Sequence, residues 1–259
     1  MRMTQPSAVS FLPLEGLPEV TPGMDLAPLI AAGVRALAPG CTEPVVIVLA
    51  QKIVSKAEGR LIELDSVTPS AEAQRLAQLT HKDPRLVQVV LDESEEVVRA
   101  APQVLIVRHR LGFVVANAGV DRSNVPRAAA GERVLLLPRD PDASAAALRR
   151  QLSEQLGMAL AVIITDSFGR PWRRGVTQVA LGCAGLPALL DRRGERDRAG
   201  RTLEVTEVAL ADAIAAGAGL VMGEAAESRP VVLALGLCWS AAERPAAALL
   251  RPRQEDLFR

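Results

Sequence analysis

The stretch Ala159-Leu-Ala-Val-Ile-Ile-Thr-Asp-Ser-Phe-Gly-Arg-Pro-Trp-Arg173 joins a buried strand to a group of polar side chains. The run from Ala159 to Ile164 is apolar throughout, as a strand inside a core requires. Asp166 and Ser167 follow it, at the strand end where α/β proteins place metal ligands or catalytic carboxylates. The arginines after them suit an anionic substrate. The alternative is that Asp166 is a turn aspartate that caps the next segment.

A similar pattern occurs about forty residues earlier. The apolar run from Phe113 to Ala116 is followed by Asn-Ala-Gly-Val and then by Asp121-Arg122-Ser123-Asn124. Each of the two aspartates has a hydroxyl and an arginine close by in the sequence. The pair therefore favours a bound cation that holds phosphate, although two capping aspartates remain the alternative.

The segments before this point alternate between helical and extended patterns. Helical spacing of apolar residues predicts a helix over 25–37 with Asp25 as its N-cap, and a second, shorter helix over 70–80. The β-branched run Val45 to Ala50 predicts a buried strand that delivers Gln51 and Lys52. Residues 103–107 and 112–116 predict a hairpin. The segment 86–91 fits either a strand or a helix.

The segments around the opening stretch predict a β-α-β unit at residues 133–165. A strand over 133–137 is followed by a helix over 142–156, which Gly157 closes, and then by a strand over 158–165. We expect parallel strands with a right-handed crossover. A further helix is expected over 204–221 and a last strand over 230–235. The fold class is mixed α/β, and residues 1–259 are expected to form a single domain.

Composition excludes several classes of protein. The chain has 259 residues, 49% of them hydrophobic, and 30 basic side chains balance 30 acidic ones. Nothing in this balance indicates a nucleic-acid or membrane-surface protein. The apolar runs are too short to span a bilayer, and we see no secretion signal, so a cytoplasmic location is expected. Cys41, Cys183 and Cys238 are scattered and indicate neither a disulfide set nor a zinc site.

Lysine is rare in this arginine-rich chain. The only lysines are Lys52, Lys56 and Lys82, and two of them share the segment Gln-Lys-Ile-Val-Ser-Lys. Lysine supplies a compact, mobile ammonium, which phosphate sites use and a guanidinium does not copy. We therefore predict a phosphate contact here, with chance placement as the alternative.

The common catalytic signatures are missing. The sequence contains no Gly-x-x-x-x-Gly-Lys-[Ser/Thr], no Gly-x-Gly-x-x-Gly after a strand and no Gly-x-Ser-x-Gly. Two distant histidines argue against zinc and heme. Oxygen donors remain, and they suit magnesium or manganese: Asp121, Asp166, Ser167 and Glu224. With the lysines and arginines, this set favours phosphoryl transfer.

At these residues the chain resembles a known family. The segments that carry the resemblance are Leu-Pro-Leu-Glu-Gly-Leu-Pro-Glu-Val-x-Pro-Gly from Leu12, Gln-Lys-Ile-Val-Ser-Lys-Ala-Glu-Gly from Gln51, Ala-Asn-Ala-Gly-Val-Asp-x-Ser-Asn-Val from Ala116, Asp-Ser-Phe-Gly-Arg-Pro-Trp-Arg from Asp166, Asp-x-x-Gly-Arg-x-Leu from Asp197 and Val-Met-Gly-Glu-Ala from Val221. In this order they resemble coenzyme F420-0:L-glutamate ligase, the gamma-glutamyl ligase family of deazaflavin coenzyme biosynthesis. Some bacterial members carry an additional flavin-reductase-like domain, and this chain resembles the stand-alone form.

The resemblance implies a GTP-dependent amide ligase. GTP would phosphorylate the terminal carboxylate of the deazaflavin precursor, and the amine of L-glutamate would attack the acyl phosphate. Further gamma-linked glutamates would follow. The family implies two divalent ions, magnesium or manganese, with potassium as an activator, an unusual mixed α/β fold and an intertwined homodimer.

The resemblance also implies roles for individual residues. Asp121 and Asp166 resemble ligands of the first metal, and Ser167 and Glu224 those of the second. We take Asp121, Asp166 and Lys56 as the catalytic candidates. The implied nucleotide contacts are Leu12, Pro13, Leu14, Glu15, Gln51, Lys52, Lys56, Asn124 and the loop 222–229 with Met222, Gly223, Ala225, Ala226 and Glu227.

This chain departs from the family pattern at three places. Glu224 stands where the family often has glutamine, Gln178 where it often has aspartate, and Ala213 where it often has glutamate. Two other functions therefore stay open. One is a ligase for a variant precursor or a different carboxylate, and the other is a metal-dependent phosphohydrolase or nucleotide-binding protein of the same fold.

Overall fold

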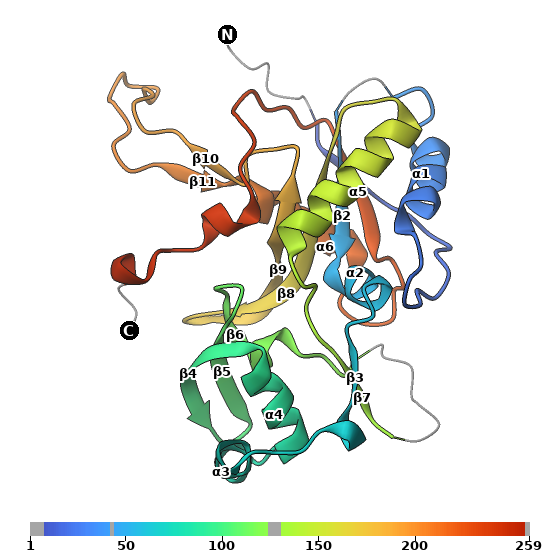
Figure 1. Ribbon diagram of the computed structural model, residues 1–259. Helices are drawn as coiled ribbons and strands as arrows, with labels where there is room; N and C mark the ends of the chain where they lie inside the picture. Colours follow the sequence, from blue (N-terminus) through green and yellow to red (C-terminus); the bar gives the residue numbers. More distant parts are fainter. Residues whose placement is uncertain (1–7, 42–43, 124–130, 257–259) are drawn as a thin grey trace.

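A five-stranded mixed sheet forms the centre of the molecule (Figure 1). The computed structural model describes residues 8–41, 44–123 and 131–256. The strand order is β1 (Ser10–Pro13), β12 (Val231–Leu235), β2 (Val45–Ala50), β8 (Leu160–Arg170) and β9 (Arg173–Ala184). Strands β2 and β8 are parallel, and the other neighbours are antiparallel.

Helices cover both faces of this sheet, so its central strands consist of apolar residues (Figure 1). In β2, Val45, Ile47 and Leu49 face a core that includes α1 (Leu26–Leu37) and α5 (Pro141–Leu156). The alternate residues Val46 and Val48 face α6 (Leu210–Met222).

The helix ends have the expected capping groups. The Asp25 side chain accepts a hydrogen bond from the Ala27 amide, as predicted for the start of α1. At the end of α5, Gly157 adopts φ of 66°, a left-handed conformation that favours glycine. Among the described residues, no helix combines the length and apolar character that crossing a membrane requires.

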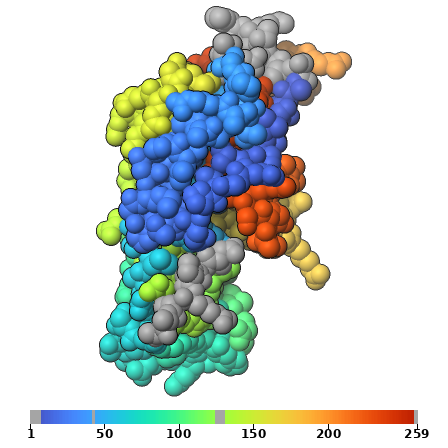
Figure 2. Space-filling view, turned by 90° about the vertical axis from the view of Figure 1, so that its right-hand side faces the viewer, coloured from blue at the N-terminus to red at the C-terminus, as the bar shows by residue number. Residues whose placement is uncertain are grey.

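A lower body forms between β2 and β8 in the sequence. Its three-stranded sheet has the order β4 (Ser94–Ala101), β5 (Val104–His109) and β6 (Val114–Ala116), and α3 (Ala71–Thr80) and α4 (Pro84–Asp92) pack on one face. Figure 2 shows this body beneath the N-terminal part of the chain. The predicted hairpin is confirmed as β5 and β6, and the ambiguous segment 86–91 is helical.

Short elements complete the fold. The two-stranded sheet of β3 (Leu61–Glu63) and β7 (Arg133–Leu135) lies where the chain enters and leaves the lower body, and β10 (Leu189–Asp191) with β11 (Glu207–Ala209) forms a projecting arm (Figure 1). The remaining helical segments are α2 (Gln51–Ala57), η1 (Leu64–Ser66), η2 (Asn117–Gly119), η3 (Ala246–Leu249) and η4 (Arg253–Glu255).

Three expectations about the second half of the chain are wrong. The succession β7, α5, β8 is present, but β7 pairs with β3 in a separate sheet, and the parallel partner of β8 is β2. The helix expected from residue 204 begins at Leu210, because residues 207–209 form β11 instead. Strand β8 also continues past Asp166 to Arg170, since it pairs with β9 over its whole length.

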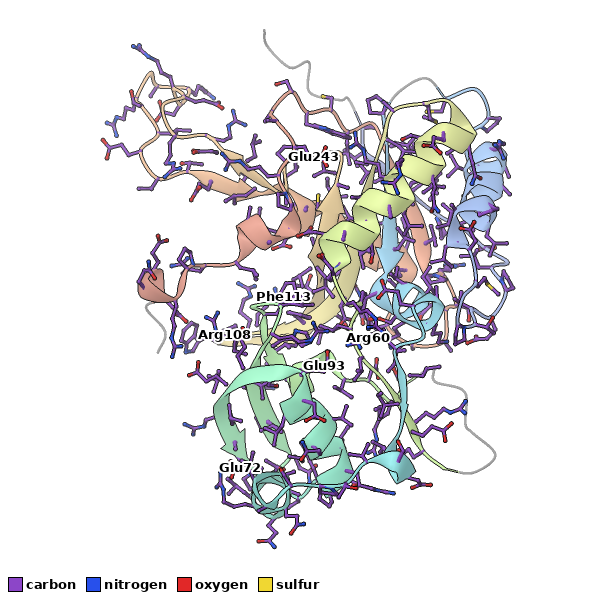
Figure 3. All side chains as sticks on the ribbon, viewed as in Figure 1. Arg60, Glu72, Glu93, Arg108, Phe113 and Glu243 are labelled. Carbon is purple, nitrogen blue, oxygen red and sulfur yellow. The ribbon has the colours of Figure 1, made fainter. Side chains whose placement is uncertain are left out.

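A buried carboxylate marks the junction of the two bodies (Figure 3). Glu93 Oε2 accepts from Arg60 Nη2 at 2.7 Å and lies 3.1 Å from Arg110 Nη2. His109 Nε2 lies 3.4 Å from the same oxygen. Burial alone would raise the pKa of Glu93, but the His109 contact and the two arginines outweigh it and lower the pKa to about 2.

Aromatic contact joins the bodies at a second place. Phe113 of the lower body and Phe168 of β8 meet edge to face, with ring centroids 6.0 Å apart. Leu137 and Leu181 complete the buried part of this cluster. The long β8–β9 hairpin therefore rests on the lower body and fixes its position below the central sheet.

Replacing Glu93 tests the ionic part of this junction. Glu93→Gln should lower the free energy of unfolding at pH 7 by about 3 kcal/mol, because it leaves Arg60 and Arg110 without their shared acid. Since the folded pKa lies below the ordinary value of 4.5, this stabilisation disappears as the pH falls from there to about 2.

Urea unfolding at pH 7 and pH 3 measures this difference. Glu72→Gln is the matched control, because Glu72 forms an exposed ion pair with Arg75 on α3. Equal stability of Glu93→Gln and Glu72→Gln at pH 7 would show that the junction does not depend on this carboxylate.

Candidate active site

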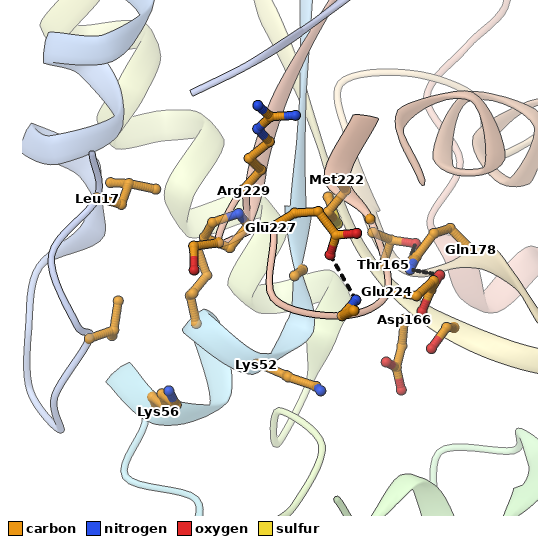
Figure 4. A pocket seen from close by; sticks show the side chains of 18 of the residues that line it. Leu17, Lys52, Lys56, Thr165, Asp166, Gln178, Met222, Glu224, Glu227 and Arg229 are labelled. Atoms are coloured by element: carbon orange, nitrogen blue, oxygen red, sulfur yellow. Dashed lines mark hydrogen bonds between the residues drawn. The ribbon is translucent and has the colours of Figure 1, made fainter. Parts of the chain in front are cut away.

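A pocket of about 260 Å³ opens beside the ends of β2 and β12 (Figure 4). It is lined by four segments: Leu17, Pro18, Glu19 and Val20 after β1; Ala50, Lys52, Ile53 and Lys56 at the end of β2 and on α2; Thr165, Asp166, Ser167 and Gln178 on β8 and β9; and Met222, Gly223, Glu224, Ala225, Glu227, Ser228, Arg229 and Pro230 before β12.

The two lysines of the pocket come from one short helix. Strand β2 ends at Ala50 and α2 begins at Gln51, so Lys52 and Lys56 lie one turn apart on the same face. Lys56 is nearly buried, and its Nζ lies 2.5 Å from Glu19 Oε1. The predicted strand that delivers Gln51 and Lys52 is thus confirmed, and both lysines line the pocket.

Lys52 connects the two aspartates that the sequence singled out. Its Nζ lies 2.6 Å from Asp121 Oδ2 and 2.7 Å from Ser123 Oγ, both in the lower body. Its charge also acts on Asp166. Burial raises the pKa of Asp121, but hydrogen bonds from Lys52 and from the Ser123 amide outweigh this effect, and the pKa is lowered.

Asp166 has the opposite electrostatic character. Burial, reinforced by the charges of Asp121 and Glu224, raises its pKa to about 7, although the Ser167 amide and Lys52 act against the rise. Figure 4 shows Asp166 and Lys52 on the same side of the pocket. The region around Asp166 forms an acidic corner of the pocket, and basic groups of the protein only partly compensate its negative charge.

A hydrogen-bonded pair lies next to Asp166. Gln178 Nε2 donates to Glu224 Oε1 at 2.9 Å, and Gln178 Oε1 lies 3.0 Å from the Thr165 hydroxyl (Figure 4). The two residues are two of the three departures noted above. Gln178 had no assigned role, and its contact with Glu224 requires the β9–α6 approach, which no local sequence pattern predicts.

These residues suit a hard divalent cation. Asp121 and Glu224 both act electrostatically on Asp166, and oxygen donors of this kind are the ligands of magnesium and manganese. Among residues 8–41, 44–123 and 131–256, no three acidic, histidine or cysteine side chains already stand together as a metal-binding group. The side chains that would hold the ion are thus near one another without being preassembled.

Only some of the other predicted nucleotide-binding residues line the pocket. Met222, Gly223, Ala225 and Glu227 line the pocket, whereas Ala226 is not part of its wall. Gly223 adopts φ of 78°, a backbone conformation that residues with a side chain rarely adopt, so this loop favours glycine at its first position.

The N-terminal and Gln51 positions lie outside the pocket wall. Leu12 and Pro13 belong to β1, Leu14 is buried in the core, and Glu15 lies 3.0 Å from Arg229, which does line the pocket. Gln51 is buried, and its Oε1 accepts from Ser55. Asn124 lies outside the described residues.

Comparison with known proteins shows the family of this chain. A family model described as F420-0:Gamma-glutamyl ligase matches residues 16–236. Coenzyme F420:L-glutamate ligase of Methanothermobacter thermautotrophicus is 46% identical over 253 residues, which cover 97% of this chain and 99% of that protein. The chain belongs to the F420-0:gamma-glutamyl ligase family.

Other members of the family are similarly close. The coenzyme F420:L-glutamate ligase of Methanopyrus kandleri is 48% identical over 252 residues, 96% of each chain. That of Archaeoglobus fulgidus is 42% identical over 251 residues, 97% of this chain and 96% of its own. The resemblance seen in the sequence motifs is therefore confirmed over nearly the whole chain.

The raised pKa of Asp166 predicts a cost in stability. Because the folded pKa lies above the ordinary value of 3.8, ionisation of Asp166 destabilises the fold as the pH rises toward about 7. Asp166→Asn should therefore raise the melting temperature of metal-free protein at pH 8 by at least about 2 °C. The gain should shrink as the pH is lowered toward 4.

Melting curves recorded with a chelator at both pH values test this. Glu154→Gln, on the exposed side of α5, controls for the loss of a negative charge alone. A melting temperature of Asp166→Asn below that of the unaltered protein at pH 8 would contradict the raised pKa assigned to Asp166.

Proposed function

We propose that this protein joins L-glutamate to the terminal carboxylate of the deazaflavin precursor F420-0, with GTP as the energy source. The observation that carries the proposal is one pocket lined both by Lys52 and Lys56 of α2 and by the buried carboxyl group of Asp166, on which the charge of Lys52 acts. Membership of the F420-0:gamma-glutamyl ligase family supports the choice of substrates. Further gamma-linked glutamates are part of the proposal.

The proposed chemistry has two steps. First, an oxygen of the precursor carboxylate attacks the γ-phosphorus of GTP, the bond between that phosphorus and the β–γ bridging oxygen breaks, and GDP leaves. An acyl phosphate results. Second, the amine of L-glutamate attacks the acyl carbon, the carbon–oxygen bond to phosphate breaks, and the amine loses a proton. Phosphate departs with the former carboxylate oxygen.

The residues proposed to act in this reaction form two groups, and of these residues Asp121 lies beside the pocket wall rather than in it. Lys52, Lys56 and Arg229 are the cationic side chains of the wall, and they suit the phosphates and the incoming carboxylate. The side chains proposed to hold two magnesium or manganese ions are Asp121, Asp166, Ser167 and Glu224. Such ions offset phosphate charge and align the attacking group when bound, and potassium is the proposed activator.

Product analysis tests this function directly. With precursor, GTP and manganese, release of phosphate should depend on L-glutamate, and the nucleotide product should be GDP. A precursor carboxylate labelled with heavy oxygen should pass one labelled atom to the released phosphate. Equal phosphate release without glutamate would indicate a phosphohydrolase, and GMP with pyrophosphate would contradict the acyl-phosphate route.

Lys56 provides a test of the nucleotide site. Lys56→Ala should weaken GTP binding by roughly 1.5–3 kcal/mol, since a buried charge-assisted contact is lost. Lys56→Arg should not restore full activity if the site requires a compact ammonium. Titration calorimetry measures both variants, with Lys82→Ala as the control because Lys82 lies at the end of α3, away from the pocket. Unchanged GTP affinity in Lys56→Ala would overturn this role.

The proposed assembly is a homodimer. Two large apolar side chains are each 85% exposed: Val205 in the arm of β10 and β11, and Leu220 on α6. Side chains that a partner subunit buries would be exposed in this way when one chain is considered alone. Light scattering at micromolar concentration should give about twice the chain mass of 27.4 kDa. A mass near that of one chain would refute the dimer.

A further inference from the structure

Gln178 is a buried polar residue in the wall of the pocket. It lies on β9, directly opposite Ser167 of β8, and is only 7% exposed. A glutamine that is removed from water must have partners for its amide groups, because an unpaired amide in the interior destabilises the fold. The hydrogen-bond partners of the Gln178 side chain therefore indicate its role in the pocket.

The stem of Gln178 is held by a close approach of α6. A Cβ on Gly219 would lie 2.6 Å from Gln178 Cγ and 3.3 Å from Gln178 Cβ. No side chain larger than hydrogen fits between the helix and the strand at this point. The glycine therefore allows the helix backbone to press against Gln178 and restricts its rotamers.

The amide of Gln178 has a polar neighbour at each end. Its Nε2 donates to Glu224 Oε1 at 2.9 Å, and this bond orients the amide. Its Oε1 lies 3.0 Å from the hydroxyl of Thr165, which is fully buried and also lies 2.7 Å from the Val179 carbonyl oxygen. Since a carboxylate only accepts and an amide nitrogen only donates, the nitrogen must face Glu224. Glu224 and Asp166 lie close together in the wall of the same pocket (Figure 4).

We infer that Gln178 is a positioning residue that holds the Glu224 carboxylate beside Asp166, and that this pair requires one acid and one amide, at either position. The inference rests on the proposed function in so far as the carboxylate serves a divalent ion. A second acid in the pair would place two carboxylates at hydrogen-bond distance next to Asp166. Two amides would leave the corner without one of its anionic ligands.

The two single substitutions should therefore fail in different ways. Glu224→Gln keeps the volume but removes a carboxylate, and it should weaken Mn²⁺ binding at least about tenfold. Gln178→Glu creates two adjacent carboxylates and should lower the melting temperature of metal-free protein at pH 8. Each substitution should suppress the defect of the other, because the double variant again has one acid and one amide.

The experiment compares five variants with the unaltered full-length chain. They are Gln178→Glu, Glu224→Gln, the double variant of these two, Gln155→Glu, which adds a carboxylate on the exposed side of α5, and Gln155→Glu combined with Glu224→Gln. Mn²⁺ binding to chelator-treated protein is measured from the electron paramagnetic resonance signal of free Mn²⁺, and melting temperatures are measured without metal. Neither measurement uses GTP, glutamate or the precursor.

The double variant decides the inference. Its affinity for Mn²⁺ should lie within about threefold of that of the unaltered protein, and its melting temperature should exceed that of Gln178→Glu. Gln155→Glu combined with Glu224→Gln should not restore the affinity for Mn²⁺. Mn²⁺ affinity as low as that of Glu224→Gln, or a melting temperature no higher than that of Gln178→Glu, would overturn it. Absence of Mn²⁺ binding in the unaltered protein would count against the proposed function, whereas recovered melting in the double variant would still support the acid–amide pair.

Discussion

The parallel pairing of β2 with β8 is the constraint on which the site depends. In this register Ala50 lies beside Thr165, so the two strands leave the pairing at the same level. Lys52 of α2 and Asp166 of β8 come just after this level in their own segments. The basic start of α2 therefore lies next to the acidic part of β8. Because parallel strands need a long connection, the whole lower body fits between them.

That connection supplies part of the site. Asp121 belongs to the lower body and reaches Lys52, so the pocket region combines groups from both bodies. The Glu93 cluster and the contact of Phe113 with Phe168 hold the bodies together at two other places. The position of Asp121 relative to Asp166 therefore depends on packing at the junction as well as on the central sheet.

The negative charge of Asp166 lowers the stability of the fold, and the same charge suits the proposed chemistry. The pKa of Asp166 is raised because burial and two neighbouring carboxylates disfavour its charged form. A site of this kind is suited to a cation, whose binding relieves the repulsion. A buried acid whose pKa is strongly raised is typical of functional sites, which is a reason to place function at this corner.

The sequence predicted local elements well and distant pairings less well. Asp25, the apolar run of β2 and the left-handed Gly157 each determine a nearby feature, and each was predicted correctly. The pairing of β7 with β3 was missed, because a three-residue strand carries no signal for its partner. Likewise Asp121 and Asp166 were predicted from strand-end patterns, whereas Gln178 depends on the close approach of α6 at Gly219.

The measurement that tests the central claim most directly is mass spectrometry of F420-0 incubated with the protein, GTP, manganese and L-glutamate. The account predicts a precursor heavier by one or more glutamyl residues, formed only when GTP and glutamate are both present. Unchanged precursor, with GTP consumed equally in the presence and absence of glutamate, would contradict it.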